Sequence, residues 1–309
     1  MFDIIVPTFK TPLNLLKKCL DSIHNQIYTE YKVWICDGTP HEWKRYDAMM
    51  QLIGQYPNVE YVRQSGKGVS QARNQIIRMG NHPYVAFLDS DDEWDMEYLI
   101  NMKEGIDNPN HDTDAIWFCE VKETTLNLEK CNLLTIGIDE RVAIEQTVEK
   151  IIQSYEPINF LPPELHLAFH LKAPIWFTGA IIKREALEKT NLFDESYQVG
   201  EDTLLIHDIL LQGYSTCFIS FLGAYRNTHS NQLTQREDTK YWNDKVEERV
   251  KEYRPLALEK FNNNKTLTPM QKKVYQPYFR SGRTAGVSLK NCSTTIGIVD
   301  IEEYELQFL

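Results

Sequence analysis

The stretch YVAFLDSDDEW, residues 84–94, joins an apolar run directly to a dense acidic run. Five strand-forming residues, 84–88, are followed by three aspartates within residues 89–92. So much negative charge at the mouth of a buried strand has two possible explanations. The acids hold a cation, or Asp92 and Glu93 cap the helix expected over 95–106.

Length, composition and charge bound the class of protein. The chain has 309 residues, enough for one large α/β domain with an appendage or for two domains. A hydrophobic content of 42% indicates a globular protein. The net charge of -11 argues against a nucleic-acid partner, which needs a basic face. It leaves room for a phosphate ligand, provided that a metal ion lies between ligand and protein.

The six cysteines are scattered along the chain, without the close pairs of a zinc knuckle or redox motif. No apolar run reaches the roughly 18 to 20 residues of a transmembrane segment. The N-terminus has no charged region followed by an apolar one, as a signal peptide would. We therefore expect a cytoplasmic protein with reduced thiols. The sequence leaves its oligomeric state open.

Strand and helix signals alternate along the first third, which is typical of a mainly parallel sheet. Apolar runs predict strands at 2–6, 31–36, 59–63 and 84–88. Helices are expected at 12–26, at 41–53 and after the glycine-bearing loop at the start of SGKGVSQARNQIIRMG, residues 65–80. Thr11 is expected to cap the first of these helices, with Pro12 as its first residue.

Ligands bind outside the carboxyl ends of the strands in open parallel sheets. Pro7 with Thr8, Asp37, the 65–73 loop and the acidic run 89–92 all follow strands. Four segments that are far apart in sequence are therefore expected to meet at one edge of the sheet.

The later chain has a looser pattern. The expected elements are a strand at 115–121, a charged helix at 141–154, a strand and helix within 176–193, a helix at 200–213, a strand at 217–226 and charged helices beyond 235. The stretch 156–178 is rich in Phe, Pro, Trp and His. It forms either an aromatic wall for a sugar acceptor or ordinary core and loop packing.

Three short motifs could carry chemistry. Asp89 and Asp91 offer hard oxygen ligands suited to Mg²⁺ or Mn²⁺. Lys67 and Arg73 place positive charge beside two glycines, which suits a phosphate or a pairing with the aspartates. The sequence Gly200-Glu201-Asp202 either caps a helix or supplies a general base, and its spacing alone does not decide between the two.

Taken in order, these segments resemble the family 2 glycosyltransferases. The matching pieces are IIVPTFKTPLNLLKKCLDSI, CDGTP, GVSQARN, VAFLDSDDEW, GEDTLL and YRNTHSNQLT, within residues 1 to 235. The resemblance implies the glycosyltransferase A-type fold of nucleotide-diphospho-sugar transferases, with a mainly parallel central sheet flanked by helices. It implies a catalytic domain over 1–235, with a nucleotide-binding half at 1–110 and an acceptor-binding half at 111–235. A mainly helical C-terminal extension over 236–309 would follow.

The resemblance also implies a function: metal-dependent, inverting transfer of a sugar from a nucleotide-sugar to a hydroxyl of a glycan or glycoconjugate acceptor. A UDP-sugar is the first expectation and a GDP-sugar the second, with Mn²⁺ or Mg²⁺ as cofactor. A non-catalytic nucleotide-sugar-binding scaffold and a sugar nucleotidyltransferase are the alternatives. The family's QxxRW motif is absent, which indicates that one sugar is added per catalytic event.

Roles for individual residues follow from the same resemblance. Asp202 would be the catalytic base, with Glu201 positioning the acceptor or the base. Asp91 and His229 would bind the metal. The nucleotide-sugar would be bound by Pro7, Thr8, Asp37, Lys67, Arg73, Asp89 and Ser90. Cys36 stands where the family usually has a further acid, so Asp37 is the sole acid of that loop.

Overall fold

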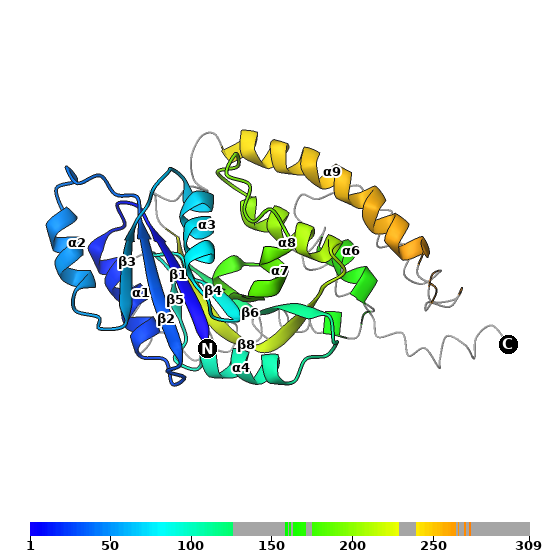
Figure 1. Ribbon diagram of the computed structural model, residues 1–309, viewed down its shortest axis with the longest axis horizontal. Helices are drawn as coiled ribbons and strands as arrows, with labels where there is room; N and C mark the ends of the chain where they lie inside the picture. The colour runs from blue at the N-terminus through cyan, green and yellow to red at the C-terminus, as the bar shows by residue number, and fades with distance from the viewer. Residues whose placement is uncertain are drawn as a thin grey trace.

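The computed structural model (Figure 1) describes residues 1–125, 158–159, 161, 163–170, 175–228, 239–263, 265, 269 and 272. The strands are β1 (Phe2–Thr8), β2 (Tyr31–Asp37), β3 (Val59–Arg63), β4 (Tyr84–Phe87), β5 (Glu93–Trp94), β6 (Asp114–Thr125), β7 (Ala180–Lys183) and β8 (Ser215–Thr228). The helices are α1 (Leu13–His24), α2 (Tyr46–Ile53), α3 (Val69–Met79), α4 (Tyr98–Asp107), η2 (Pro163–Leu165), α6 (His166–His170), η3 (Phe177–Gly179), α7 (Arg184–Glu188), α8 (Glu201–Leu211) and α9 (Thr239–Asn263).

One eight-stranded sheet runs through the described part of the chain, in the order β3-β2-β1-β4-β7-β6-β8-β5. The first four strands are parallel, as the alternating sequence pattern predicts. Strand β7 enters antiparallel between β4 and β6, and the two-residue β5 pairs antiparallel with β8. The mixed α/β fold is thus confirmed, with its parallel part confined to the first half of the sheet and the β6–β8 pair.

Alternating strand residues send apolar side chains to both faces of the sheet, because successive side chains of a strand point in opposite directions. On β1, Ile4 and Val6 pack with α1, α2 and α4 on one face. Ile5 belongs to the other face, which α3, α7, α8 and α9 cover. The result is a three-layer arrangement in which helices bury both faces of the sheet.

Helix α9 lies along α8 (Figure 1) and contributes to the same core. Its buried residues Val250, Tyr253, Ala257 and Phe261 follow a helical spacing of three or four. Tyr253 Oη also donates to Asp208 Oδ1 at 2.6 Å. The proposed domain boundary at 235 and the charged helix at 141–154 fall on residues outside the described part, so both stay predictions.

The start of α1 differs from the sequence expectation. Pro12 is the N-cap and helical residues begin at Leu13. Thr11 does not cap the helix, because its hydroxyl pairs with the Ser90 hydroxyl at 2.7 Å. The Pro12 carbonyl instead accepts the first backbone hydrogen bonds of the helix. The second helix is also shorter than expected, because residues 41–45 form turns and α2 starts at Tyr46.

Candidate active site

The ends of the parallel strands meet at one edge of the sheet, as the sequence predicts. Thr8 and Asp37 are register partners on β1 and β2. The backbone of Gly38 donates to the Thr8 carbonyl at 2.9 Å, which locks these two strand ends together. Arg73, from the first turns of α3, reaches Asp89 after β4.

Arg73 is the centre of the site. Its Nη2 donates to Asp89 Oδ1 at 2.7 Å, and its Nη1 donates to Glu201 Oε1, also at 2.7 Å. The guanidinium is buried, with only 3% of the residue exposed, and packs against the rings of Phe177 and Phe193, whose centres are 5.4 and 5.3 Å away. Its Nε is buried and has no hydrogen-bond partner among the described residues. One side chain therefore joins the acidic run after β4 to the start of α8.

Glu201 and Asp202 open helix α8. The preceding Gly200 is left-handed, with φ 78°, a conformation that glycine adopts without the strain other residues incur. Asp202 Oδ1 accepts the backbone N–H of Thr203 at 2.7 Å. Burial and the neighbouring Asp202 charge raise the pKa of Glu201 to about 7, against the attraction of Arg73. Burial likewise raises the pKa of Asp202, opposed by Arg73. Two adjacent carboxyl groups with raised pKa values at one helix start suit acid–base chemistry.

The acidic run divides into exposed and buried members. Asp89 has 45% of its side chain exposed beside Arg73, and Asp91 is partly exposed. Asp92 is buried, and its Oδ1 accepts the backbone N–H of Asn227 at 3.0 Å. Burial, and then the charges of Asp89 and Asp91, hold the pKa of Asp92 well above its usual range.

The expectation that Asp92 and Glu93 cap the next helix is wrong. Helix α4 starts at Tyr98, beyond their reach, and Glu93 begins strand β5. Asn227 of β8 donates through Nδ2 to the Asp91 carbonyl at 2.7 Å and to Glu93 Oε1 at 3.1 Å. Asp92 and Glu93 therefore anchor the acidic run to β8 and fix the backbone that carries Asp89 and Asp91.

A divalent metal fits the donor chemistry of this run. The described residues hold no cluster of three or more His, Cys, Asp and Glu side chains that could form a complete metal cage. Mg²⁺ is commonly held by one or two carboxylates plus water and substrate phosphates, and the partly exposed Asp89 and Asp91 match that pattern. His229 lies outside the described residues.

Asp37 is fully buried and both of its oxygens are in use. Oδ1 accepts the backbone N–H of Thr39 at 2.8 Å. Oδ2 accepts from Tyr61 Oη at 2.9 Å and from Arg63 Nη1 at 3.0 Å. The side chain holds the loop after β2 to strand β3 rather than facing an open surface.

The other expected nucleotide contacts lie along the same edge. Pro7 is partly buried, and Thr8 is buried with no hydrogen-bond partner for its hydroxyl among the described residues. Lys67 is exposed in the loop before α3. Ser90 is buried and its hydroxyl is paired with Thr11, so it links the acidic run to the β1–α1 loop.

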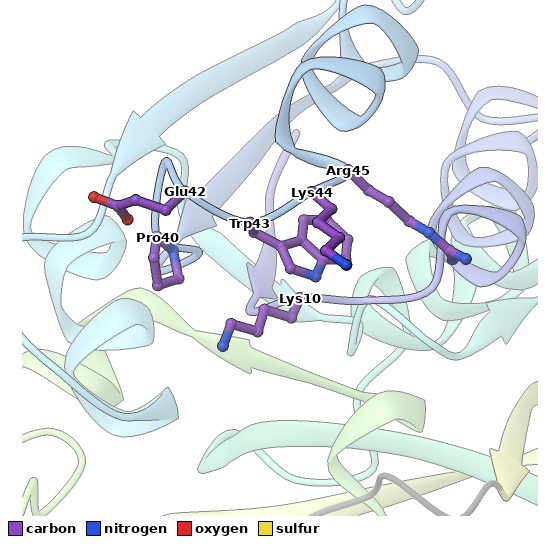
Figure 2. A pocket seen from close by; sticks show the side chains of 6 residues that line it. All are labelled: Lys10, Pro40, Glu42, Trp43, Lys44 and Arg45. Atoms are coloured by element: carbon purple, nitrogen blue, oxygen red, sulfur yellow. The ribbon is translucent and has the colours of Figure 1, made fainter.

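Two features of this edge were not foreseen. Phe9, directly after β1, is 58% exposed. A hollow of about 430 Å³ lies beside it and is lined by Lys10, Pro40, Glu42, Trp43, Lys44 and Arg45 (Figure 2). Neither has a sequence signal, because an exposed aromatic in a loop has the same local pattern as a buried one. The hollow gathers three cations on a protein of net charge -11.

The described residues contain no helix that is long and apolar enough to span a membrane.

Comparison with protein families gives a match over most of the described sheet. The model described as "Glycosyl transferase family 2" matches residues 3–190. Among curated proteins, glycosyltransferase GlyA of Streptococcus pneumoniae serotype 4 is 32% identical over 108 residues, which are 33% of this chain and 14% of GlyA. The chain therefore aligns with a small part of that relative.

Solved structures share the fold at low sequence identity. The crystal structure of S. aureus TarS 1-349 in complex with UDP-GlcNAc superposes with a TM-score of 0.55 at 16% identity, covering 90% of this chain and 71% of that one. The mannosyltransferase PcManGT from Pyrobaculum calidifontis, in complex with GDP-Man and Mn²⁺, also has a TM-score of 0.55, at 14% identity, covering 95% and 72%.

Proposed function

This chain belongs to glycosyl transferase family 2, and on that premise we propose that it transfers a sugar from a nucleotide-sugar to a hydroxyl of a glycan or glycoconjugate. The transfer is metal-dependent and inverts the anomeric centre. The observation that carries this proposal is the double ion pair of Arg73 with Asp89 and Glu201. One guanidinium holds the acidic run, on the nucleotide side of the site, next to the start of the catalytic helix α8.

Asp202 is the general base in this proposal. Glu201 is engaged by Arg73, whereas the hydrogen bonds of Asp202 to the described residues use Oδ1 alone. Its raised pKa makes it a stronger proton acceptor toward neutral pH. A single base that deprotonates the acceptor hydroxyl, with no covalent intermediate, gives inversion. Glu201 and Arg73 are positioning residues that keep this helix start beside Asp89.

The nucleotide lies over the ends of β1 to β4. Pro7, Thr8, Lys67, Asp89 and Ser90 border it, and the buried Thr8 hydroxyl has no hydrogen-bond partner within the part of the chain that the structure describes. Asp37 acts through the residues it holds, because its own oxygens are occupied. The exposed Phe9 ring provides a face on which a base can stack. TarS with UDP-GlcNAc and PcManGT with GDP-Man support a UDP-sugar or a GDP-sugar as donor.

Asp91 and His229 would hold the metal, which would be Mn²⁺ or Mg²⁺. When bound, it supplies positive charge to the diphosphate leaving group. The Mn²⁺ in the complex of PcManGT with GDP-Man supports this assignment. Exhaustive chelation is expected to abolish turnover, and added Mn²⁺ or Mg²⁺ to restore it; full activity in the chelator would refute metal dependence.

The direct test measures release of nucleoside diphosphate from UDP-glucose, UDP-galactose, UDP-N-acetylglucosamine and GDP-mannose, with Mn²⁺ and a panel of glycoside acceptors. Asp202→Asn is expected to lower transfer by about 10²–10⁴-fold while leaving nucleotide affinity unchanged. Asp112→Asn, at an exposed position, is the matched control. Turnover that survives in Asp202→Asn would exclude this residue as the base. Nucleotide-sugar binding without transfer would indicate a scaffold, and pyrophosphate release from a nucleoside triphosphate would indicate a nucleotidyltransferase.

A further inference from the structure

Trp176 is an exposed aromatic residue in an otherwise buried segment. It is 45% exposed, whereas Phe177, Thr178 and Gly179 directly after it are buried. Three of the other five tryptophans are buried and two are only partly exposed. An indole carries a large apolar surface, and leaving it in water forgoes the free energy of burying it. Its exposure therefore calls for an explanation.

Contacts on either side place Trp176 at the rim of the active site. The ring of Phe177 lies 5.4 Å from the Arg73 guanidinium, which binds Asp89 and Glu201. The Arg226 guanidinium lies 4.7 Å from the centre of the Trp176 ring. Arg226 immediately precedes Asn227, the residue that anchors the acidic run. The indole thus contacts the strand that supports the proposed metal ligands, and the next residue of the chain packs on Arg73.

Hydrogen bonds to its backbone fix the turn that carries this indole. The Trp176 carbonyl accepts the N–H of Gly179 at 3.0 Å, which closes the single turn of η3. The Thr178 carbonyl accepts Trp94 Nε1 at 2.7 Å, which ties the same turn to β5. The Thr178 hydroxyl is buried and has no hydrogen-bond partner among the described residues. An exposed aromatic face on this turn, beside the Arg226 guanidinium, is suited to a ligand with one apolar and one polar side.

A pyranose ring is such a ligand, because its C–H groups form an apolar face and its hydroxyls line the edge. We infer that Trp176 forms the acceptor subsite, on which the ring of the accepting sugar stacks while its hydroxyl is presented to Asp202. The assignment rests on the proposed transfer reaction. The nucleotide occupies the ends of β1 to β4, and Trp176 precedes β7, on the other side of β4 in the sheet. The inferred acceptor is therefore a sugar, in preference to a simple alcohol without a ring.

The test separates acceptor binding from chemistry at the donor. In the intact chain with Mn²⁺, hydrolysis of the nucleotide-sugar by water reports on the donor site alone. Transfer to p-nitrophenyl glycosides reports on stacking, and transfer to glycerol reports on a hydroxyl without a ring. Trp176→Ala is expected to raise KM for the glycoside by tenfold or more and to change hydrolysis and glycerol transfer by less than twofold. Trp176→Phe should recover part of the loss, because a smaller aromatic face remains.

Tyr241→Ala removes an exposed aromatic from α9, 61% exposed against 45% for Trp176, and is the control, expected to change none of these rates. An unchanged KM in Trp176→Ala would overturn the inference, as would an equal loss of glycerol transfer. A second readout needs no turnover: methyl glycosides should shift the tryptophan emission of the wild type to shorter wavelength, and Trp176→Phe should abolish the shift. If the wild type neither hydrolyses nor transfers any of the four nucleotide-sugars, the proposed function fails and the inference falls with it. Hydrolysis that persists without any effect of Trp176 overturns the inference alone.

Discussion

Replacing Glu201 by glutamine is expected to raise the free energy of unfolding and to lower the transfer activity. Burial raises the pKa of this carboxyl from 4.5 to about 7, even with Arg73 beside it. Each unit of pKa difference corresponds to about 1.4 kcal/mol, so ionised Glu201 costs the native state about 3 kcal/mol above pH 7. Glutamine carries no charge to desolvate, and its carbonyl can still accept the hydrogen bond from Arg73.

The pH dependence of the difference is specific to this mechanism. A carboxyl whose native pKa is raised binds its proton more tightly in the folded state, so its contribution to stability falls as pH rises from 4.5 to 7. The free energy of unfolding of Glu201→Gln should therefore exceed that of the wild type by about 3 kcal/mol at pH 8. The two proteins should converge near pH 4.5. Subtracting the two curves removes the titration of other groups that the change leaves undisturbed.

The assay is urea unfolding at pH 5, 6, 7 and 8, with thermal unfolding as a check. For 309 residues, 3 kcal/mol corresponds to a rise in Tm of about 4–5 °C at pH 8. Glu188→Gln changes an exposed carboxylate on α7 and should alter stability by less than about 0.5 kcal/mol. Transfer activity of Glu201→Gln should fall, because the ion pair that aligns α8 with Asp89 is weakened. A difference that does not vary with pH, or a less stable variant at pH 8, would refute the reasoning.

Three further changes test other parts of the structure. Asn227→Ala removes two hydrogen bonds to the acidic run. Nucleotide affinity, measured by calorimetry, should therefore weaken when Mn²⁺ is present and stay constant when it is absent. Equal weakening in both conditions would contradict the anchoring role of Asn227. Gly80→Ala places a Cβ 2.4 Å from the buried Asp3 Oδ2 and should lower the free energy of unfolding in urea by about 1–3 kcal/mol. Gly54→Ala, whose new Cβ would lie no closer than 3.4 Å to any neighbouring atom, is a near-neutral control. Equal effects of the two changes would show that the close contact at Gly80 relaxes freely. Burial lowers the pKa of His207 to about 4. Between pH 6.5 and pH 4, the free energy of unfolding of the wild type should therefore fall by about 3 kcal/mol more than that of His207→Leu. Parallel curves of unfolding free energy against pH would mean that His207 is protonated at little cost.

The parallel half of the fold was predictable because its signals are local. Apolar runs bounded by glycine and proline fix β1 to β4 within a few residues, and the rule for strand ends correctly brings Thr8, Asp37 and Asp89 to one edge. The insertion of β7 between β4 and β6 has no such signal. A four-residue apolar strand has the same sequence pattern in a parallel and in an antiparallel pair. Its position and direction in the sheet are therefore determined only by packing in the folded protein.

The candidate site shows the same division. The acidic run, Arg73 and the start of α8 stand out in the sequence as candidates for chemistry. The roles of Asp92 and Glu93 do not, because their partner Asn227 lies 135 and 134 residues further along the chain. The local charge suggested a helix cap, whereas the tertiary contact with β8 determines where the two side chains lie. Asp37 is a similar case, since Tyr61 and Arg63 occupy an oxygen that the sequence leaves open.

The ion pair between Arg73 and Glu201 cannot form until both residues have been added to the chain on the ribosome. The two residues are 128 positions apart. At roughly 5–20 residues per second, Glu201 is added roughly 6–26 seconds after Arg73. During that interval β1 to β4 can already assemble, while the edge of β4 that pairs with β7 stays unpaired until β7 is made. A chain that terminates early would therefore carry a bare strand edge, open to pairing with its neighbours. Synthesis of β7 covers this strand edge, and the site is complete only after β8 has brought Asn227 to the acidic run.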